Sequence, residues 1–149
     1  MILVRGDAAE VALGEAQAVL ALVHDGERRG RLADLVAAIQ DGELGDDEAQ
    51  ALEELIELGL SSGRIRGIYG PEGEQAALKT FRRLPGGRAL ADSAGEVSEA
   101  LKALEGRPLE KVSVQAAAPG EYIVDLSADG IQLSVRLGRN GARIGSVGV

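Results

Sequence analysis

Apolar positions along this chain of 149 residues follow two different periods. Up to about residue 106 they recur every three or four residues, the spacing that places one apolar stripe on a helix. After that point they alternate with polar residues, as in strands that bury one face. The pattern therefore predicts an α+β fold, with a helical domain over residues 1–106 and a small antiparallel β subdomain over residues 107–149.

Three short helices joined by glycine-bearing turns are expected first, after one or two short strands at the N-terminus. The first two helices end at Asp25–Gly26 and at Gly42, and the third runs from Asp46–Asp47 to a stop at Gly59. The two aspartates can cap the third helix, and their charge suits a helix N-terminus. The expected buried positions are Ala16, Val19, Leu20 and Val23, then Leu32, Leu35, Val36 and Ile39, then Ala49, Leu52, Ile56 and Leu60.

The next stretch has a less definite pattern. Ile65, Gly67 and Tyr69 alternate with other residues, which favours a strand over residues 64–69. Residues 71–84 fit a helix, because Pro71 can occupy its first position and acidic residues follow in the first turn. Alternatively, residues 79–84 fit the return strand of a hairpin with residues 64–69, with residues 70–75 as its tip. Local propensity favours the helix, and both interpretations stay open at this point.

A further helix and four strands complete the predicted elements. Ser93 and Glu96 have the spacing of a capping box, which predicts a helix that ends at Gly106. Four alternating segments follow, KVSVQA, EYIVDLS, IQLSVRL and ARIGSVGV, and Asn140–Gly141 is a strong two-residue hairpin signal. We expect a four-stranded antiparallel meander whose apolar face is covered by a helix or by a second subunit. The apolar face should include Ile123, Leu133, Val135 and Ile144.

The charge is unevenly distributed. The net charge of the chain is −8, but residues 64–88 carry six basic residues against Glu72 and Glu74, so that this basic segment has a net charge of +4. Such a segment can attract phosphate locally in a protein that repels nucleic acid overall. It can equally balance the acidic remainder through surface ion pairs. The candidate phosphate contacts are Arg64, Arg66, Lys79, Arg82, Arg83 and Arg88.

Composition argues against most enzyme chemistry. The chain has no cysteine, and His24 is its only histidine, so that thiolate chemistry, histidine metal clusters and histidine-based triads have no support. The glycines match no phosphate-binding loop, and the acidic run from Asp41 lacks the ligand spacing of a calcium loop. We therefore expect no catalytic residue, no cofactor and no metal. The absence of a signal-peptide pattern or a membrane-spanning apolar run predicts a cytoplasmic protein of bacterial type, with no membrane partner.

Two phrases of the sequence resemble a known family. LEELIELGL at residues 52–60 and FRRLPGGRAL at residues 81–90 are similar to the end of the third helix and the end of the wing in winged helix-turn-helix regulators of the MarR and PadR type. The resemblance covers about residues 8–105. It implies a winged-helix-like domain, DNA binding, a dimer, and a wing formed by the basic segment.

The third helix departs from that family. The resemblance would place Glu48, Ala51, Glu54 and Leu58 outward, flanked by Gln50, Glu53 and Glu57, whereas base edges are read best by Arg, Lys, Asn or Gln. Two hypotheses remain. The first, which the resemblance favours and which we prefer at this point, is a non-enzymatic transcription regulator whose basic segment contacts the DNA backbone. The second is an adaptor whose acidic third helix binds a protein partner through Glu48, Glu54 and Glu57, without DNA. A helix over residues 71–84 would remove the wing and favour the adaptor.

Overall fold

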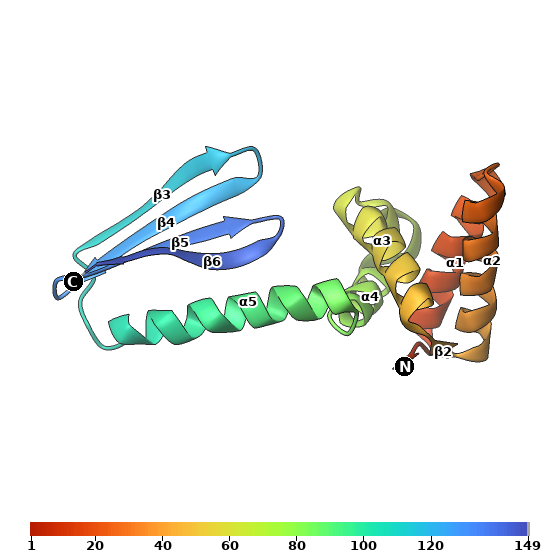
Figure 1. Cartoon of the computed structure of the whole chain (residues 1–149), viewed down its shortest axis with the longest axis horizontal. Helices are drawn as coiled ribbons and strands as arrows, with labels where there is room; N and C mark the ends of the chain where they lie inside the picture. The colour runs from red at the N-terminus through yellow and green to blue at the C-terminus, as the bar shows by residue number, and fades with distance from the viewer. Residues whose placement is uncertain (149) are drawn as a thin grey trace. The chain divides into compact units, whose positions relative to one another are not determined.

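The computed structural model describes residues 1–148 and shows an α+β fold, in which five helices precede a four-stranded antiparallel sheet (Figure 1). The chain divides into two compact units, residues 1–88 and residues 89–149. The division lies inside the fifth helix, earlier than the change of period near residue 106. The helices are α1 (Asp7–Leu22), α2 (Gly26–Asp41), α3 (Asp46–Ser61), α4 (Arg64–Phe81) and α5 (Pro85–Leu101), followed by the short 3-10 helix η1 (Lys102–Leu104).

Aliphatic side chains of α1 to α4 form the core of the first unit. A two-stranded antiparallel sheet, β1 (Ile2–Leu3) with β2 (Glu43–Leu44), closes one end of this core. Each large side chain buried here contributes on the order of 1.5–3 kcal/mol. Of the predicted stripes, Leu35, Leu52 and Ile56 are almost fully buried, whereas Val19, Leu20, Val23, Val36 and Leu60 are only half-buried. The largest fully buried side chains are Leu35, Leu44, Leu52, Ile56, Ile65 and Leu84.

Gly42 ends α2 and α3 begins at Asp46, as predicted, but α1 ends at Leu22, so that Asp25 and Gly26 start the second helix instead of ending the first. The N-cap of α3 is Gly45, without a side-chain hydrogen bond, so the predicted aspartate caps are wrong. The Asp25 carboxylate accepts a hydrogen bond of 2.8 Å from the Arg28 backbone N–H, which caps α2. Gly42 ends the helix in the left-handed conformation, at φ 84°, and its N–H bonds back to the last turn. The third helix begins at Asp46 as expected. It does not stop at Gly59, however, because Gly59 is buried within α3.

Residues 64–69 are helical, so the predicted strand is wrong. They form the first part of α4, and residues 71–81 form the second part after a break at Gly70, whose φ of 72° is not helical. Ile65 and Tyr69 satisfy a helical spacing of four as well as an alternating one, which is why the local pattern misled. Ile65 is fully buried in the core, and the exposed Arg66 forms an ion pair of 3.2 Å with Glu74. Residues 71–81 confirm the helix that local propensity favoured, and the hairpin interpretation is wrong.

The fifth helix begins earlier than the capping-box pattern predicted. Ser93 and Glu96 lie inside α5, which starts at Pro85. Its N-terminus is instead capped by Glu53 of α3, whose carboxylate accepts a hydrogen bond of 2.7 Å from the Gly86 backbone N–H. A negative charge from another helix thus replaces a local cap. Ser93 instead donates to the Leu90 carbonyl and accepts from the Ala142 backbone N–H of the sheet.

The four-stranded meander is confirmed. Its strands pair in chain order, with antiparallel registers and a shift in register between β5 and β6 after Ser134. Asp129–Gly130 adopts positive φ angles at the turn between the middle strands, as a tight hairpin requires. The strands are β3 (Lys111–Ala118), β4 (Glu121–Ala128), β5 (Ile131–Gly138) and β6 (Gly141–Gly148).

One face of this sheet is apolar and packs against the end of α5 and against η1. Leu133 and Ala128 are buried there with Leu104, and Ile144 is half-buried beside them. The prediction for Ile123 is wrong, because it pairs with Gln115 and Arg136 and so lies on the polar face. Both sets of alternate positions in the strand sequence EYIVDL contain an apolar residue, so the sequence does not show which set faces the covered side. The pairing register with the neighbouring strands determines the face.

Candidate functional site

The basic segment does not form one continuous patch. The Arg64 Nε atom lies 3.1 Å from the carboxylate of Glu15, a residue of α1 that is buried with only 3 % of its surface exposed. Arg66 is engaged with Glu74 across the break in α4. These two arginines therefore stabilise the packing of α4 and are already neutralised.

The other four basic residues lie at the second half of α4 and beyond it. Arg82 and Arg88 are exposed, and so are Lys79 and Arg83. Among residues 1–148 none of these four is within ion-pair distance of a carboxylate. Of the six residues predicted as phosphate contacts, four therefore remain available to bind an anion.

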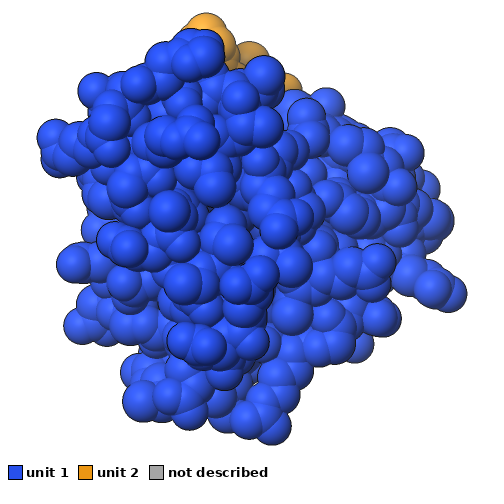
Figure 2. Space-filling view, turned by 90° about the vertical axis from the view of Figure 1, so that its right-hand side faces the viewer, with its two compact units in different colours: residues 1–88 blue, residues 89–149 orange. Residues whose placement is uncertain are grey.

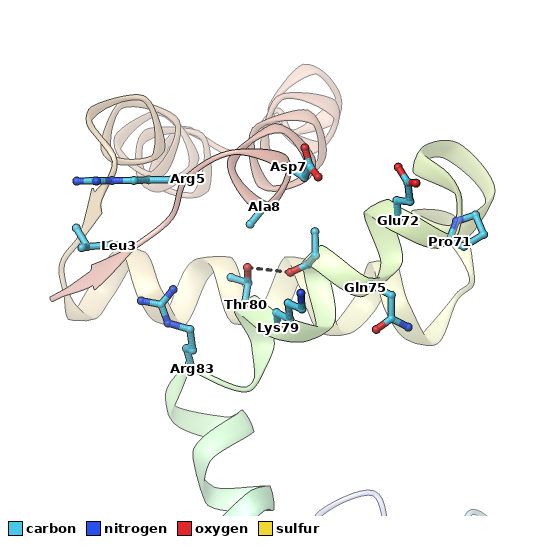
Figure 3. A pocket seen from close by; sticks show the side chains of 11 residues that line it. Leu3, Arg5, Asp7, Ala8, Pro71, Glu72, Gln75, Lys79, Thr80 and Arg83 are labelled. Atoms are coloured by element: carbon cyan, nitrogen blue, oxygen red, sulfur yellow. Dashed lines mark hydrogen bonds between the residues drawn. The ribbon is translucent and has the colours of Figure 1, made fainter.

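Lys79 and Arg83 line a hollow between α1 and the second half of α4, which we call the α1–α4 hollow (Figure 3). Its volume is about 860 Å³. It lies entirely in the first unit, whose surface is shown in Figure 2. The sequence did not predict this hollow, because Arg5 and Asp7 come from a segment more than sixty residues away from Lys79. The lining residues are Leu3, Arg5, Asp7, Ala8, Pro71, Glu72, Gln75, Ala76, Lys79, Thr80 and Arg83.

The acidic third helix lines a second hollow. This groove, of about 310 Å³, runs between α2 and α3 and contains Glu48 and Glu54, two of the three residues predicted for protein docking. Sequence reasoning missed the contribution of α2, which adds Arg31 and Asp34. The remaining lining residues are Asp47, Gln50 and Ala51. Four carboxylates against one arginine give the α2–α3 groove a net negative charge.

The other acids of α3 have different surroundings. Glu53 caps α5 and is only half-exposed, so it does not belong to an outward acidic face. Glu57 is exposed but does not line the α2–α3 groove. Leu58 is 64 % exposed on the same helix, one turn beyond Glu54. An apolar side chain therefore follows the acidic groove along α3.

A polar cluster joins α1 to the first part of α4. Burial raises the pKa of the Tyr69 hydroxyl above its ordinary value, and the charge of Glu15 and a hydrogen bond to it raise the pKa further. The ring of Tyr69 lies directly against Gly14, and its Cβ atom lies against Gly73, so that neither glycine leaves room for a larger residue. Glu15 thus holds both Arg64 and Tyr69, and the cluster fixes the helical course of residues 64–69.

The described residues offer no site for a metal. No group of three or more His, Asp or Glu side chains in residues 1–148 is arranged to hold an ion. No helix within those residues combines the length and apolarity needed to cross a bilayer. Comparison with protein-family models, with curated proteins and with solved structures finds no match to this chain.

Proposed function

We propose that this protein is a non-enzymatic cytoplasmic adaptor that binds a basic segment of a protein partner in the α2–α3 groove, without binding DNA. The observation that carries the proposal is the helical conformation of residues 64–81. In a winged-helix regulator these residues would form a hairpin wing that contacts DNA through basic side chains. In this chain they form helix α4 instead. The resemblance to winged-helix regulators therefore supports a scaffold more than a DNA-binding role.

The charge of the groove supports the nature of the partner. Helix α3 carries six acidic residues and no basic residue over Asp46–Ser61, and four carboxylates line the groove itself. DNA, with one charge about every 1.7 Å of its axis, would be repelled from this face. A segment with lysine or arginine would be attracted to Asp34, Asp47 and Glu54. The exposed Leu58 would contact an apolar side chain of the same segment.

Titration of a labelled amphipathic peptide of lysine and leucine, followed by fluorescence anisotropy, tests this proposal. We expect binding that weakens as salt is added, because the attraction is between exposed charges. Glu54→Lys should weaken binding about tenfold or more, since it replaces an attraction by a repulsion. Glu96→Lys makes the same change of charge on α5, outside the groove, and serves as the matched control. Equal effects of the two variants would contradict the proposal.

A second titration with duplex DNA separates the adaptor from the regulator. The adaptor should not bind DNA even at low salt. The regulator would bind with a steep dependence on salt, because phosphate contacts release counterions. Its binding would be abolished by Arg82→Glu combined with Arg83→Glu. Salt-dependent DNA binding that this double variant abolishes would refute the adaptor and support the regulator.

A further inference from the structure

The α1–α4 hollow has charges of opposite sign at its two ends. Arg5, from the segment before α1, and Arg83, from the end of α4, lie on one side of the hollow, whereas Glu72 and Pro71 lie on the other (Figure 3). Asp7 belongs with Glu72, because these two residues also line a neighbouring hollow of about 320 Å³ together with Glu10. That neighbouring hollow contains no basic residue. The acidic end thus continues into a surface whose only charged residues are acidic, which would attract a cation.

The charges at the two ends do not neutralise each other. Within residues 1–148, no ion pair joins Asp7 or Glu72 to Arg5, Lys79 or Arg83. All five side chains belong to exposed residues. Both groups are therefore available to a ligand, and a ligand with only one charge would be attracted to one end and repelled from the other.

Helical geometry gives the distance between the ends. Glu72, Gln75, Ala76 and Lys79 have the spacing of one helical face, and all four line the hollow. A rise of about 1.5 Å per residue puts Glu72 and Lys79 roughly 10 Å apart along the axis, with Arg83 beyond them. An extended peptide spans about 3.3 Å per residue, so four residues, about 13 Å, reach from Glu72 past Lys79 toward Arg83.

Between its charged ends the hollow is apolar and offers donors. The side chains of Ala8 and Ala76 line this part, and Leu3 adds an apolar side chain at the basic end beside Arg5 (Figure 3). Helix α1 begins there after Gly6, which has no side chain to cap the first backbone N–H groups. These N–H groups and the Gln75 amide can bond to the carbonyl groups of an extended chain. The hollow thus matches a peptide backbone with apolar side chains.

We propose that the α1–α4 hollow binds a short extended peptide of about four residues with two free ends. The N-terminal ammonium lies at Asp7 and Glu72, and the C-terminal carboxylate lies at Arg5 and Arg83. Lys79, between the ends, adds attraction for the carboxylate. This site is separate from the α2–α3 groove and is independent of the proposed adaptor function.

Isothermal titration calorimetry of the full chain with the tetrapeptide Ala-Leu-Leu-Ala tests the proposal. Acetylation of the N-terminus and amidation of the C-terminus should each weaken binding about fivefold, the effect of removing one exposed charge pair. The dipeptide Leu-Leu, at about 7 Å, cannot span the hollow and should bind more weakly than either blocked tetrapeptide.

Variants at each end establish the orientation. In Asp7→Asn combined with Glu72→Gln, acetylation of the peptide should no longer matter, whereas amidation should still weaken binding. In Arg5→Gln combined with Arg83→Gln, the reverse is expected. Glu43→Gln combined with Arg88→Gln neutralises exposed charges outside the hollow and should leave all affinities unchanged. These substitutions are on the surface, and circular dichroism can confirm that each variant is folded.

Three results would overturn the proposal. One is the absence of heat with any of the tetrapeptides. Another is equal affinity for free and acetylated peptides, which would indicate a site for a simple anion. The third is that acetylation and amidation of the peptide weaken binding equally in both pairs of end variants. This result would indicate unspecific electrostatic attraction.

Discussion

Replacing Gly59 by alanine should destabilise the first unit, although alanine is the better helix former. A Cβ atom at position 59 would lie 2.6 Å from Cδ1 and 2.7 Å from Cγ1 of Ile65, well inside the usual carbon–carbon separation of about 3.5–4.0 Å. Ile65 is fully buried and cannot move outward. Overpacking of this kind costs about 1–3 kcal/mol, against a gain of about 1 kcal/mol in helix propensity. The expected net loss is about 1 kcal/mol.

Gly67→Ala is the matched control. Gly67 also lies in a helix, but a Cβ atom there would meet no atom within 4 Å. Alanine should therefore stabilise the chain by about 1 kcal/mol. The two substitutions are chemically the same, so their difference, about 2 kcal/mol, isolates the contact with Ile65. Urea unfolding followed by circular dichroism measures both values.

A double variant makes the test specific. Ile65→Ala removes both Cδ1 and Cγ1, the two atoms nearest to the new methyl group, and should reduce the cost of Gly59→Ala. Additive effects of the two substitutions would refute the contact. A destabilising Gly67→Ala would refute the helical conformation of residues 64–69. Each outcome thus tests one part of the reasoning.

Three further predictions concern the polar clusters and the sheet. Glu15→Gln should lower the raised pKa of Tyr69 toward its ordinary value of 10.0, which tyrosinate absorbance in a Tyr122→Phe background measures. Because the pKa of Tyr69 is higher in the folded chain than in the unfolded chain, neutral Tyr69 stabilises the fold fully below pH 10.0. This stabilisation is lost as pH rises through the folded pKa. Glu53→Ala should cost about 1 kcal/mol in urea unfolding by removing the cap of α5, whereas Glu54→Ala should cost little because Glu54 is exposed. Leu133→Ala should lower the free energy of unfolding by about 2–5 kcal/mol, and Ile123→Thr should lower it much less. Leu133 is 3 % exposed on the covered face of the sheet, whereas Ile123 lies on the other face. Equal losses of stability in the two variants would contradict the register.

Elements with long patterns and strong end signals were predictable from the sequence. The helix from Asp46 has several turns of apolar positions, and the hairpins of the meander have clear turn residues. Residues 64–69 are too few to separate a period of two from a period of four. Their conformation depends on the ion pair of Arg64 with Glu15, 49 residues away, and no local signal reveals such a contact.

The candidate site was predictable only in part. Glu48 and Glu54 could be chosen from the charge of α3, but Asp34 joins them only because α2 packs beside α3. The α1–α4 hollow brings residues 5–8 next to residues 71–83, a proximity that comes from packing. Spacing along a sequence identifies one face of one helix, and a site between two helices needs their relative position.

The close approach of side chains to glycines has a consequence for related sequences. Gly14 lies against the ring of Tyr69, and Gly59 lies against Ile65. A larger residue at either glycine is compatible with the fold only if its neighbour becomes smaller. We therefore expect paired changes at positions 14 and 69 and at positions 59 and 65 when natural homologues are aligned. Such covariation would trace the contacts between α1, α3 and α4 through evolutionary history.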